Sequence, residues 1–116
     1  VTFRTQTDGP ARDITVRFRA FDTGIGFRYA RKQQPALEGD IAIVEELTQF
    51  GVGEKTTMWY TPSDEFNRNE YIYRVAPAGQ VDDAHTPSTF RTPGGTYMAI
   101  HEAALTNYSS MSLDQL

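Results

Sequence analysis

The residue of this sequence best suited to chemistry is Glu102, a carboxylate at the end of an otherwise apolar segment. If residues 97–103 form an extended strand, side chains alternate between its faces, and Glu102 continues the row of Met98 and Ile100. A carboxylate there either lies just past the core edge in water, or is held in a cleft by a cation or hydrogen-bond donors, because burying it unpaired costs too much free energy. Glu102 is therefore the first candidate for metal or substrate chemistry.

His101 is the second candidate, as an imidazole that could donate to a substrate hydroxyl or orient a carboxylate. In a regular strand its side chain faces away from that of Glu102 and lies beside Tyr97. This placement favours packing or a hydrogen bond there, with substrate contact as the alternative.

Two further groups of charged residues invite a catalytic or metal-binding reading. Glu45 and Glu46 are adjacent, so in a strand they point to opposite faces and cannot flank one scissile bond at roughly 5–10 Å, as acid–base hydrolysis requires. Asp82, Asp83 and His85 lack the Asp-x-Asp-x-Asp-Gly spacing of a calcium loop. Both groups are interpreted as solvated surface.

Adjacent aromatic residues suggest a platform for a ring-shaped ligand. Trp59 and Tyr60 point to opposite faces of a strand, which favours a core role for one and an edge role for the other over a shared platform. Tyr71 and Tyr73 share a face, where cross-strand packing is the default.

Composition and charge narrow the class of protein. The 116 residues include no cysteine, which excludes disulfides, thiolate nucleophiles and cysteine-ligated zinc. The net charge is −4, and residues 41–116 carry four Lys/Arg against ten Asp/Glu, so nucleic acid is not an expected partner. No apolar run approaches the roughly 20 residues that span a bilayer, and no signal peptide is present in the sequence given.

Short strands separated by turn residues must position these candidates. Alternation and β-branched or aromatic runs predict extended segments at 1–6, 13–20, 25–29, 56–60, 71–75, 88–91 and from 96 onward. Turns are predicted at Thr7–Pro10, Asp22–Gly24 and Pro93–Gly95, and loops at 31–40 and 80–87. Residues 64–70 could form a short helical turn.

Two positions in this pattern are ambiguous. Residues 41–51 fit a helix or a strand, and strand is favoured. Gly26 marks either a bulge or the close approach of another backbone. Six or more strands predict an all-β fold, an antiparallel sheet or β-sandwich, within a single domain spanning residues 1–116.

The ordered blocks of this sequence resemble the N-terminal domain of glycoside hydrolase family 97, the α-glucosidase and α-galactosidase family. The residues that carry the resemblance are Arg17–Tyr29, Glu45–Phe50, Trp59–Pro62, Tyr97–Leu105, Tyr108 and Met111. The resemblance implies part of a larger β-super-sandwich similar to that of galactose mutarotases, followed by a catalytic (β/α)8 barrel that this chain lacks. It also implies a periplasmic enzyme.

By this resemblance, the Glu of the His-Glu-Ala-Ala-Leu motif, Glu102 here, joins barrel carboxylates around a calcium ion at the sugar site. His101, next to it in the chain, stays the candidate for substrate contact. Calcium takes six to eight oxygens at about 2.3–2.6 Å, so this chain alone is not expected to hold it tightly or to hydrolyse sugars. The general acid and the base or nucleophile are expected in the barrel.

Other readings of the chain remain open. It could be a stand-alone carbohydrate-binding or adhesion-type β-sandwich, or a structural sandwich without a ligand. Exposed apolar faces, if the sandwich is incomplete, predict self-association. The choice between glucosides and galactosides, and between inversion and retention, lies outside these residues.

Overall fold

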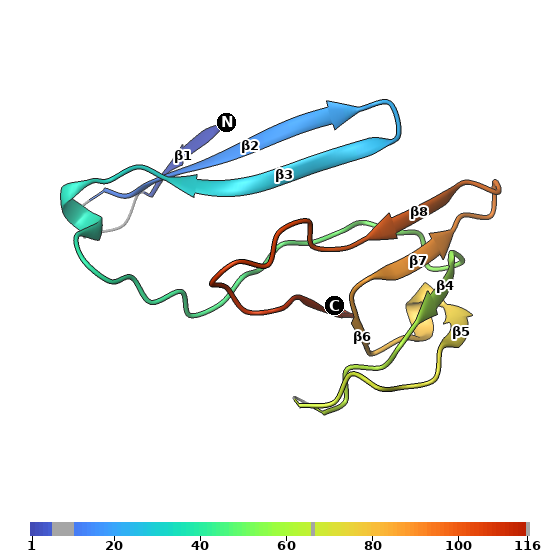
Figure 1. Ribbon diagram of the computed structural model, residues 1–116. Helices are drawn as coiled ribbons and strands as arrows, with labels where there is room; N and C mark the ends of the chain where they lie inside the picture. Colours follow the sequence, from blue (N-terminus) through green and yellow to red (C-terminus); the bar gives the residue numbers. More distant parts are fainter. Residues whose placement is uncertain (6–10, 66, 116) are drawn as a thin grey trace. The chain divides into compact units, whose positions relative to one another are not determined.

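The computed structural model describes residues 1–5, 11–65 and 67–115, and among these it contains strands and two short 3-10 turns but no α-helix (Figure 1). All strand pairs are antiparallel, which confirms the all-β prediction. The chain divides into two compact units, residues 1–48 and 49–116. None of the helices in the described ranges has the length and apolarity needed to cross a membrane. The turn predicted at Thr7–Pro10 lies outside the described residues.

The first unit is a three-stranded sheet in the order β1-β2-β3. Its strands are β1 (Thr2–Arg4), β2 (Asp13–Phe21) and β3 (Gly24–Arg31), followed by a 3-10 turn, η1 (Pro35–Leu37). Pairing runs without interruption from Ile14↔Arg31 to Phe21↔Gly24, so the predicted tight hairpin around Asp22 is confirmed. β2 and β3 form one long ribbon in Figure 1.

Gly26 occupies a regular position in this ribbon. It marks neither a bulge nor the close approach of another backbone, the two roles predicted for it. It pairs with Arg19 in the continuous register, so there is no bulge. A methyl group built there would meet only the Phe21 ring among the described atoms, at 3.8 Å, so no other backbone approaches closely. The aromatic ring of Phe21 lies beside the glycine and shields its backbone.

One face of this first sheet is apolar and exposed. Residues directly opposite each other share a face, and this face carries Phe3, Ile14, Val16, Phe18, Ala20, Ile25, Phe27 and Tyr29. Only Val16 is buried, while Phe18 and Ile25 are 59% and 70% exposed. This unit therefore leaves the apolar side of its sheet largely uncovered.

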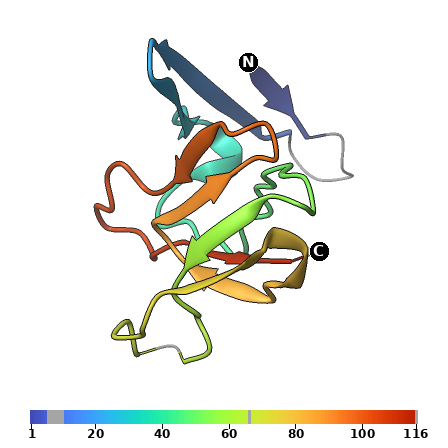
Figure 2. The same ribbon diagram turned by 90° about the vertical axis from the view of Figure 1, so that its right-hand side faces the viewer.

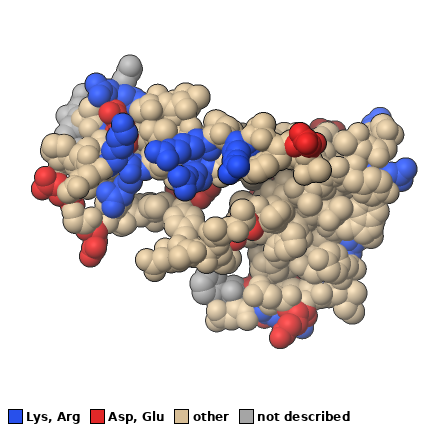
Figure 3. Space-filling view, turned by 45° about the horizontal axis from the view of Figure 1, so that its top comes forward, with Lys and Arg blue, Asp and Glu red and all other residues tan. Residues whose placement is uncertain are grey.

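The other face of the first sheet is polar and rich in arginine. Arg17 stands opposite Arg28, and Arg4 pairs with Asp13 through contacts of 2.8 and 3.1 Å. This ion pair lowers the pKa of the Asp13 carboxyl, chiefly through the hydrogen bond from Arg4. Figure 3 shows basic side chains gathered over this region, interspersed with acidic ones.

The second unit contains two sheets that enclose a small core. Its elements are β4 (Thr57–Tyr60), β5 (Arg74–Pro77), η2 (Ala78–Gln80), β6 (Asp83–His85), β7 (Ser88–Arg91), β8 (Tyr97–Ile100) and β9 (Ser112–Asp114). The order is β5-β4-β7-β8 in one sheet and β6-β9 in the other. β9, near the C-terminus, returns to lie beside β6 (Figure 2).

Alternate residues of the larger sheet supply the core. Met58 and Tyr60 of β4 and Phe90 of β7 are at most 8% exposed, and they pack with Val81 and Ala84. Leu113 of β9 covers this cluster from the smaller sheet. The strand prediction at 88–91 is confirmed residue for residue, and that at 56–60 to within one residue.

Four segments of these sheets and loops differ from the sequence predictions. Residues 41–51 form no strand, and Ile43, Val44 and Leu47 are solvent-exposed, with Val44 at 96%. The strand expected at 71–75 begins at Arg74 and continues to Pro77. The predicted loop at 80–87 contains β6, and residues 64–70 form no helix among those described.

Two of these errors have a common physical cause. A strand exists only where a neighbour accepts its backbone hydrogen bonds, and the β-branched run at 41–51 has no such neighbour among the described residues. Residues 83–85 carry little strand signal, but β9 lies beside them and completes their ladder. In both segments, the presence or absence of a pairing strand distant in sequence determined whether a strand formed.

Candidate functional site

Glu102 lies in an irregular segment just after β8. The pairing of β8 with β7 ends at Ile100↔Ser88, so the prediction that Glu102 extends the apolar row of the strand is wrong. Its half-buried carboxylate accepts a hydrogen bond from the backbone N–H of Met111, with 3.0 Å between Met111 N and Oε2. A hydrogen-bond donor of the chain itself therefore holds this carboxylate in place.

His101 and Glu102 line the same surface hollow. The hollow has a volume of about 250 Å³ and is also lined by Thr86, Pro87 and Leu105. The expectation that the two side chains face apart required a regular strand, and the strand ends before them. His101 is exposed, and its Nδ1 donates to the backbone carbonyl of Glu102 at 2.9 Å. In the neutral ring this tautomer leaves Nε2 as an acceptor.

Among the described residues, Glu102 supplies the one carboxylate that this hollow offers to a metal ion. Across residues 1–5, 11–65 and 67–115, no three His, Asp or Glu side chains come together as metal ligands do. A carboxylate has about four lone-pair positions, and the bond from Met111 uses one of them. Glu102 therefore fits the role of one calcium ligand, and the remaining oxygens would have to come from elsewhere.

The other acidic candidates are not assembled into a site. Glu45 and Glu46 lie in the exposed segment after η1, where Glu46 accepts a hydrogen bond from the Thr48 hydroxyl at 2.8 Å. Asp83 accepts from the Ser63 backbone N–H at 2.9 Å. The interpretation as solvated surface agrees with Glu45 and Glu46, whereas Asp83 and His85 are half-buried in β6.

The aromatic pair Trp59 and Tyr60 divides between two faces, as expected. Tyr60 is 8% exposed in the core, and Trp59 lies on the opposite face of the sheet. There the Trp59 ring stacks with that of Tyr97, with 6.1 Å between centroids and 27° between planes. The Arg91 guanidinium lies 5.7 Å from the Tyr97 ring centroid. This outer face combines two aromatic rings with a cation, an arrangement that the sequence reading missed because Tyr97 is distant in sequence.

Tyr71 makes a loop contact rather than the cross-strand packing predicted for it and Tyr73, since the strand begins only at Arg74. Its ring lies 6.4 Å from that of His85, and the Arg68 guanidinium lies 4.8 Å from its centroid. The phenol oxygen is buried without a hydrogen-bond partner among the described residues. Burial, followed by the charge of Glu65, raises the pKa of Tyr71 above its usual value. Tyr73 is 62% exposed.

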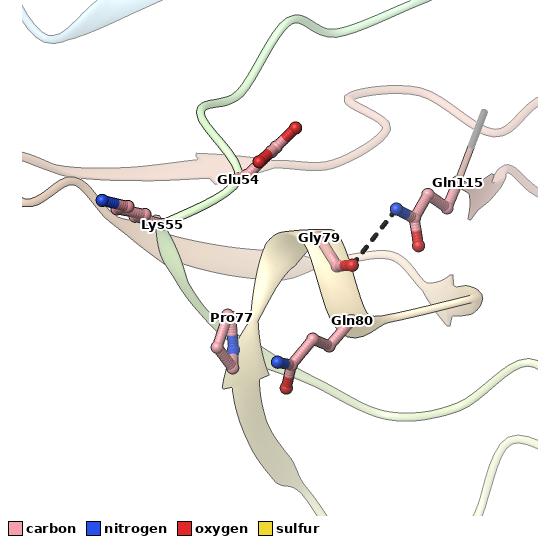
Figure 4. A pocket seen from close by; sticks show the side chains of 6 residues that line it. All are labelled: Glu54, Lys55, Pro77, Gly79, Gln80 and Gln115. Atoms are coloured by element: carbon pink, nitrogen blue, oxygen red, sulfur yellow. Dashed lines mark hydrogen bonds between the residues drawn. The ribbon is translucent and has the colours of Figure 1, made fainter.

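A larger hollow lies on another part of the second unit. Its volume is about 540 Å³, and it is lined by Glu54, Lys55, Pro77, Gly79, Gln80 and Gln115. The Gln115 amide donates to the Gly79 carbonyl at 3.2 Å, and the charged ends of Glu54 and Lys55 do not converge (Figure 4). It brings no reactive groups together.

Comparison with known proteins defines the class of this chain. All residues, 1–116, match the family described as Glycosyl-hydrolase 97 N-terminal. The fold superposes with a TM-score of 0.88 on a family 97 enzyme from Pseudoalteromonas sp. strain K8 in complex with acarbose, at 41% identity over 99% of this chain. Two variants of a family 97 enzyme from that strain, one of them in complex with panose, match with the same TM-score at 40% and 41% identity.

The fold and these matches define an antiparallel β domain from the N-terminal part of a glycoside hydrolase. The chain belongs to glycoside hydrolase family 97, which confirms the resemblance seen in its motifs. It covers 17% of the length of each of the three matched chains. The chain thus corresponds to the N-terminal family and spans about a sixth of the matched enzymes.

Proposed function

We propose that this chain packs on the catalytic domain of a family 97 glycoside hydrolase and supplies Glu102 as one ligand of a calcium ion at the sugar site. The observation that supports the proposal is the carboxylate itself, which borders a hollow while its Oε2 accepts a hydrogen bond from Met111. A backbone N–H fixes the orientation of a carboxylate without neutralising its charge. The charge is then available to a cation.

Bound calcium would polarise an oxygen of the substrate and orient the sugar beside the catalytic groups. The contribution of this chain is geometric and electrostatic. Glu102 supplies one negative oxygen, and His101, on the rim of the same hollow, offers a ring nitrogen to a sugar hydroxyl. The general acid and its partner carboxylate belong to the catalytic domain, so the 116-residue chain alone is inactive.

Family membership supports the rest of the proposal. We propose α-glucosides or α-galactosides as substrates, in keeping with the complexes that matched enzymes form with acarbose and panose. Location in the periplasm is proposed on the same resemblance.

The substitution Glu102→Gln in the full-length protein that contains this chain tests the calcium role. Calcium affinity depends on the number of charged ligands, so we expect the dissociation constant to rise on the order of 100-fold. Isothermal titration of calcium into chelator-treated protein measures it. Glu70→Gln removes the same charge from an exposed position and is expected to leave the affinity unchanged. Equal affinities for wild type and Glu102→Gln would disprove the ligand role.

A second candidate function, carbohydrate binding by the domain surface, is favoured by the stacked rings of Trp59 and Tyr97. Tyr97 is 63% exposed, and sugar rings pack their C–H faces on such aromatics. If this face binds glycans, Trp59→Ala is expected to weaken retention on a glycan array about fivefold, because removing one stacked ring loses about 1 kcal/mol. Ile72→Ala, an apolar change at an exposed position outside the strands, serves as the control. Absence of wild-type binding would reject this function.

A further inference from the structure

The position of Met111, which donates to Glu102, depends on how the second sheet ends. β6 and β9 pair from Asp83↔Asp114 to His85↔Ser112, and one more step of this register would set Thr86 opposite Met111. The backbone ladder stops there. The next residue along the chain from Thr86 is Pro87, which has no N–H to donate.

Beyond the last backbone pair of β6 and β9, the side chain of Thr86 makes the next hydrogen bond between the two segments. Its hydroxyl donates to the Met111 carbonyl, with 3.0 Å between Oγ1 and the oxygen. The hydroxyl of buried Ser88 donates to the His85 carbonyl at 2.8 Å, which fixes the backbone just before Thr86. Ser88 thus holds the backbone at the end of β6, and Thr86 joins Met111 to it.

The backbone of Met111 thus makes two hydrogen bonds, one as acceptor and one as donor. The carbonyl accepts from Thr86, and the N–H donates to Oε2 of Glu102. Residues 103–110, which connect the two ends of this arrangement, are all exposed. The two hydrogen bonds of Met111 therefore connect Glu102 to the end of β6 across this exposed segment.

We propose that Thr86 is a positioning residue for the Glu102 carboxylate and acts through the backbone of Met111. The effect of Thr86 on calcium binding rests on the proposed function of Glu102, whereas its effect on the geometry does not. Thr86 lines the same hollow as Glu102 and His101, but its hydroxyl is committed to Met111, so it needs no contact with the ion.

The test compares Thr86→Val, which keeps the shape and removes the hydroxyl, with Thr86→Ser, which keeps the hydroxyl, both in the full-length protein. Loss of an outer contact to a metal ligand weakens metal binding 10–100-fold. We expect Thr86→Val to raise the calcium dissociation constant about tenfold and Thr86→Ser to stay within about twofold of wild type. Thr89→Val, on the exposed face of β7, is the matched control and should behave as wild type.

Hydrogen exchange of the calcium-free protein, followed by mass spectrometry over residues 101–115, provides a readout independent of calcium. Thr86→Val should speed exchange in this segment, and Thr86→Ser should not. Unchanged exchange in Thr86→Val overturns the inference. So does unchanged calcium affinity in Thr86→Val if Glu102→Gln weakens binding. If Glu102→Gln leaves calcium affinity unchanged, the proposed function fails, and the exchange data alone decide the role of Thr86.

Discussion

Replacing Phe90 by alanine is expected to destabilise the second unit by about 3–5 kcal/mol, the usual cost of removing a buried aromatic side chain. Phe90 is 2% exposed and stands between Met58 of β4 and Met98 of β8 in the sheet register. The small core has few other side chains to close the cavity. Urea unfolding of the 116-residue chain, followed by tryptophan fluorescence, measures the change through Trp59.

The control for this experiment is Thr89→Ala, at the adjacent position on the exposed face of the same strand. We expect it to cost less than about 1 kcal/mol, as surface substitutions usually do. If Phe90→Ala does not fold, Phe90→Leu provides a milder cavity. A loss below 1 kcal/mol for Phe90→Ala would show that the cluster around Met58 is not the stabilising core.

The exposed apolar face of the first unit is expected to drive self-association of the isolated chain. An uncovered sheet face of this kind buries itself against a second copy when its natural covering layer is missing. Phe18, opposite Phe27 with ring centroids 6.0 Å apart, lies within this face. Phe18→Lys puts a charge there and should weaken association at least about tenfold, since burying one aromatic side chain contributes about 1.5–3 kcal/mol.

Sedimentation velocity over a range of concentrations measures this association. Thr23→Lys adds the same charge at the hairpin turn and is expected to associate as the wild type does. A wild-type chain that stays monomeric at all concentrations would contradict the expectation. It would mean that the face is covered within the chain in solution.

Local pattern predicted the parts of the fold that depend on local pairing. The alternation from Ile14 to Ala20, followed by Asp22 and Thr23, specifies the β2–β3 hairpin because its strands are adjacent in sequence. The turn at Pro93–Gly95 likewise joins β7 to β8, and Gly95 adopts φ of +88° there. Strand β9 was missed because Ser112–Asp114 is short and pairs with a segment about 30 residues earlier.

The candidate site could likewise be predicted only where it depends on residues close in sequence. Sequence reasoning found Glu102 and His101 because a carboxylate and an imidazole interrupt an apolar run. It placed their side chains on opposite faces because periodicity cannot indicate where a strand loses its partner. Met111 contacts Glu102 across nine residues of sequence, and Thr86 contacts Met111 across 25. A threonine before a proline gives no sign of such a contact in the sequence.

The segment between Ile100 and Met111 is a closed arc with both ends fixed, one by β8 and the other by Thr86 and β9. The chain reverses within it at Asn107, whose φ of 56° suits asparagine. The entropy of closing such an arc grows only with the logarithm of its length, so doubling it costs about 0.6 kcal/mol. Residues can therefore be inserted or exchanged along the arc while its two ends keep their places. Evolution can reshape the rim around Glu102 in this segment without refolding the domain.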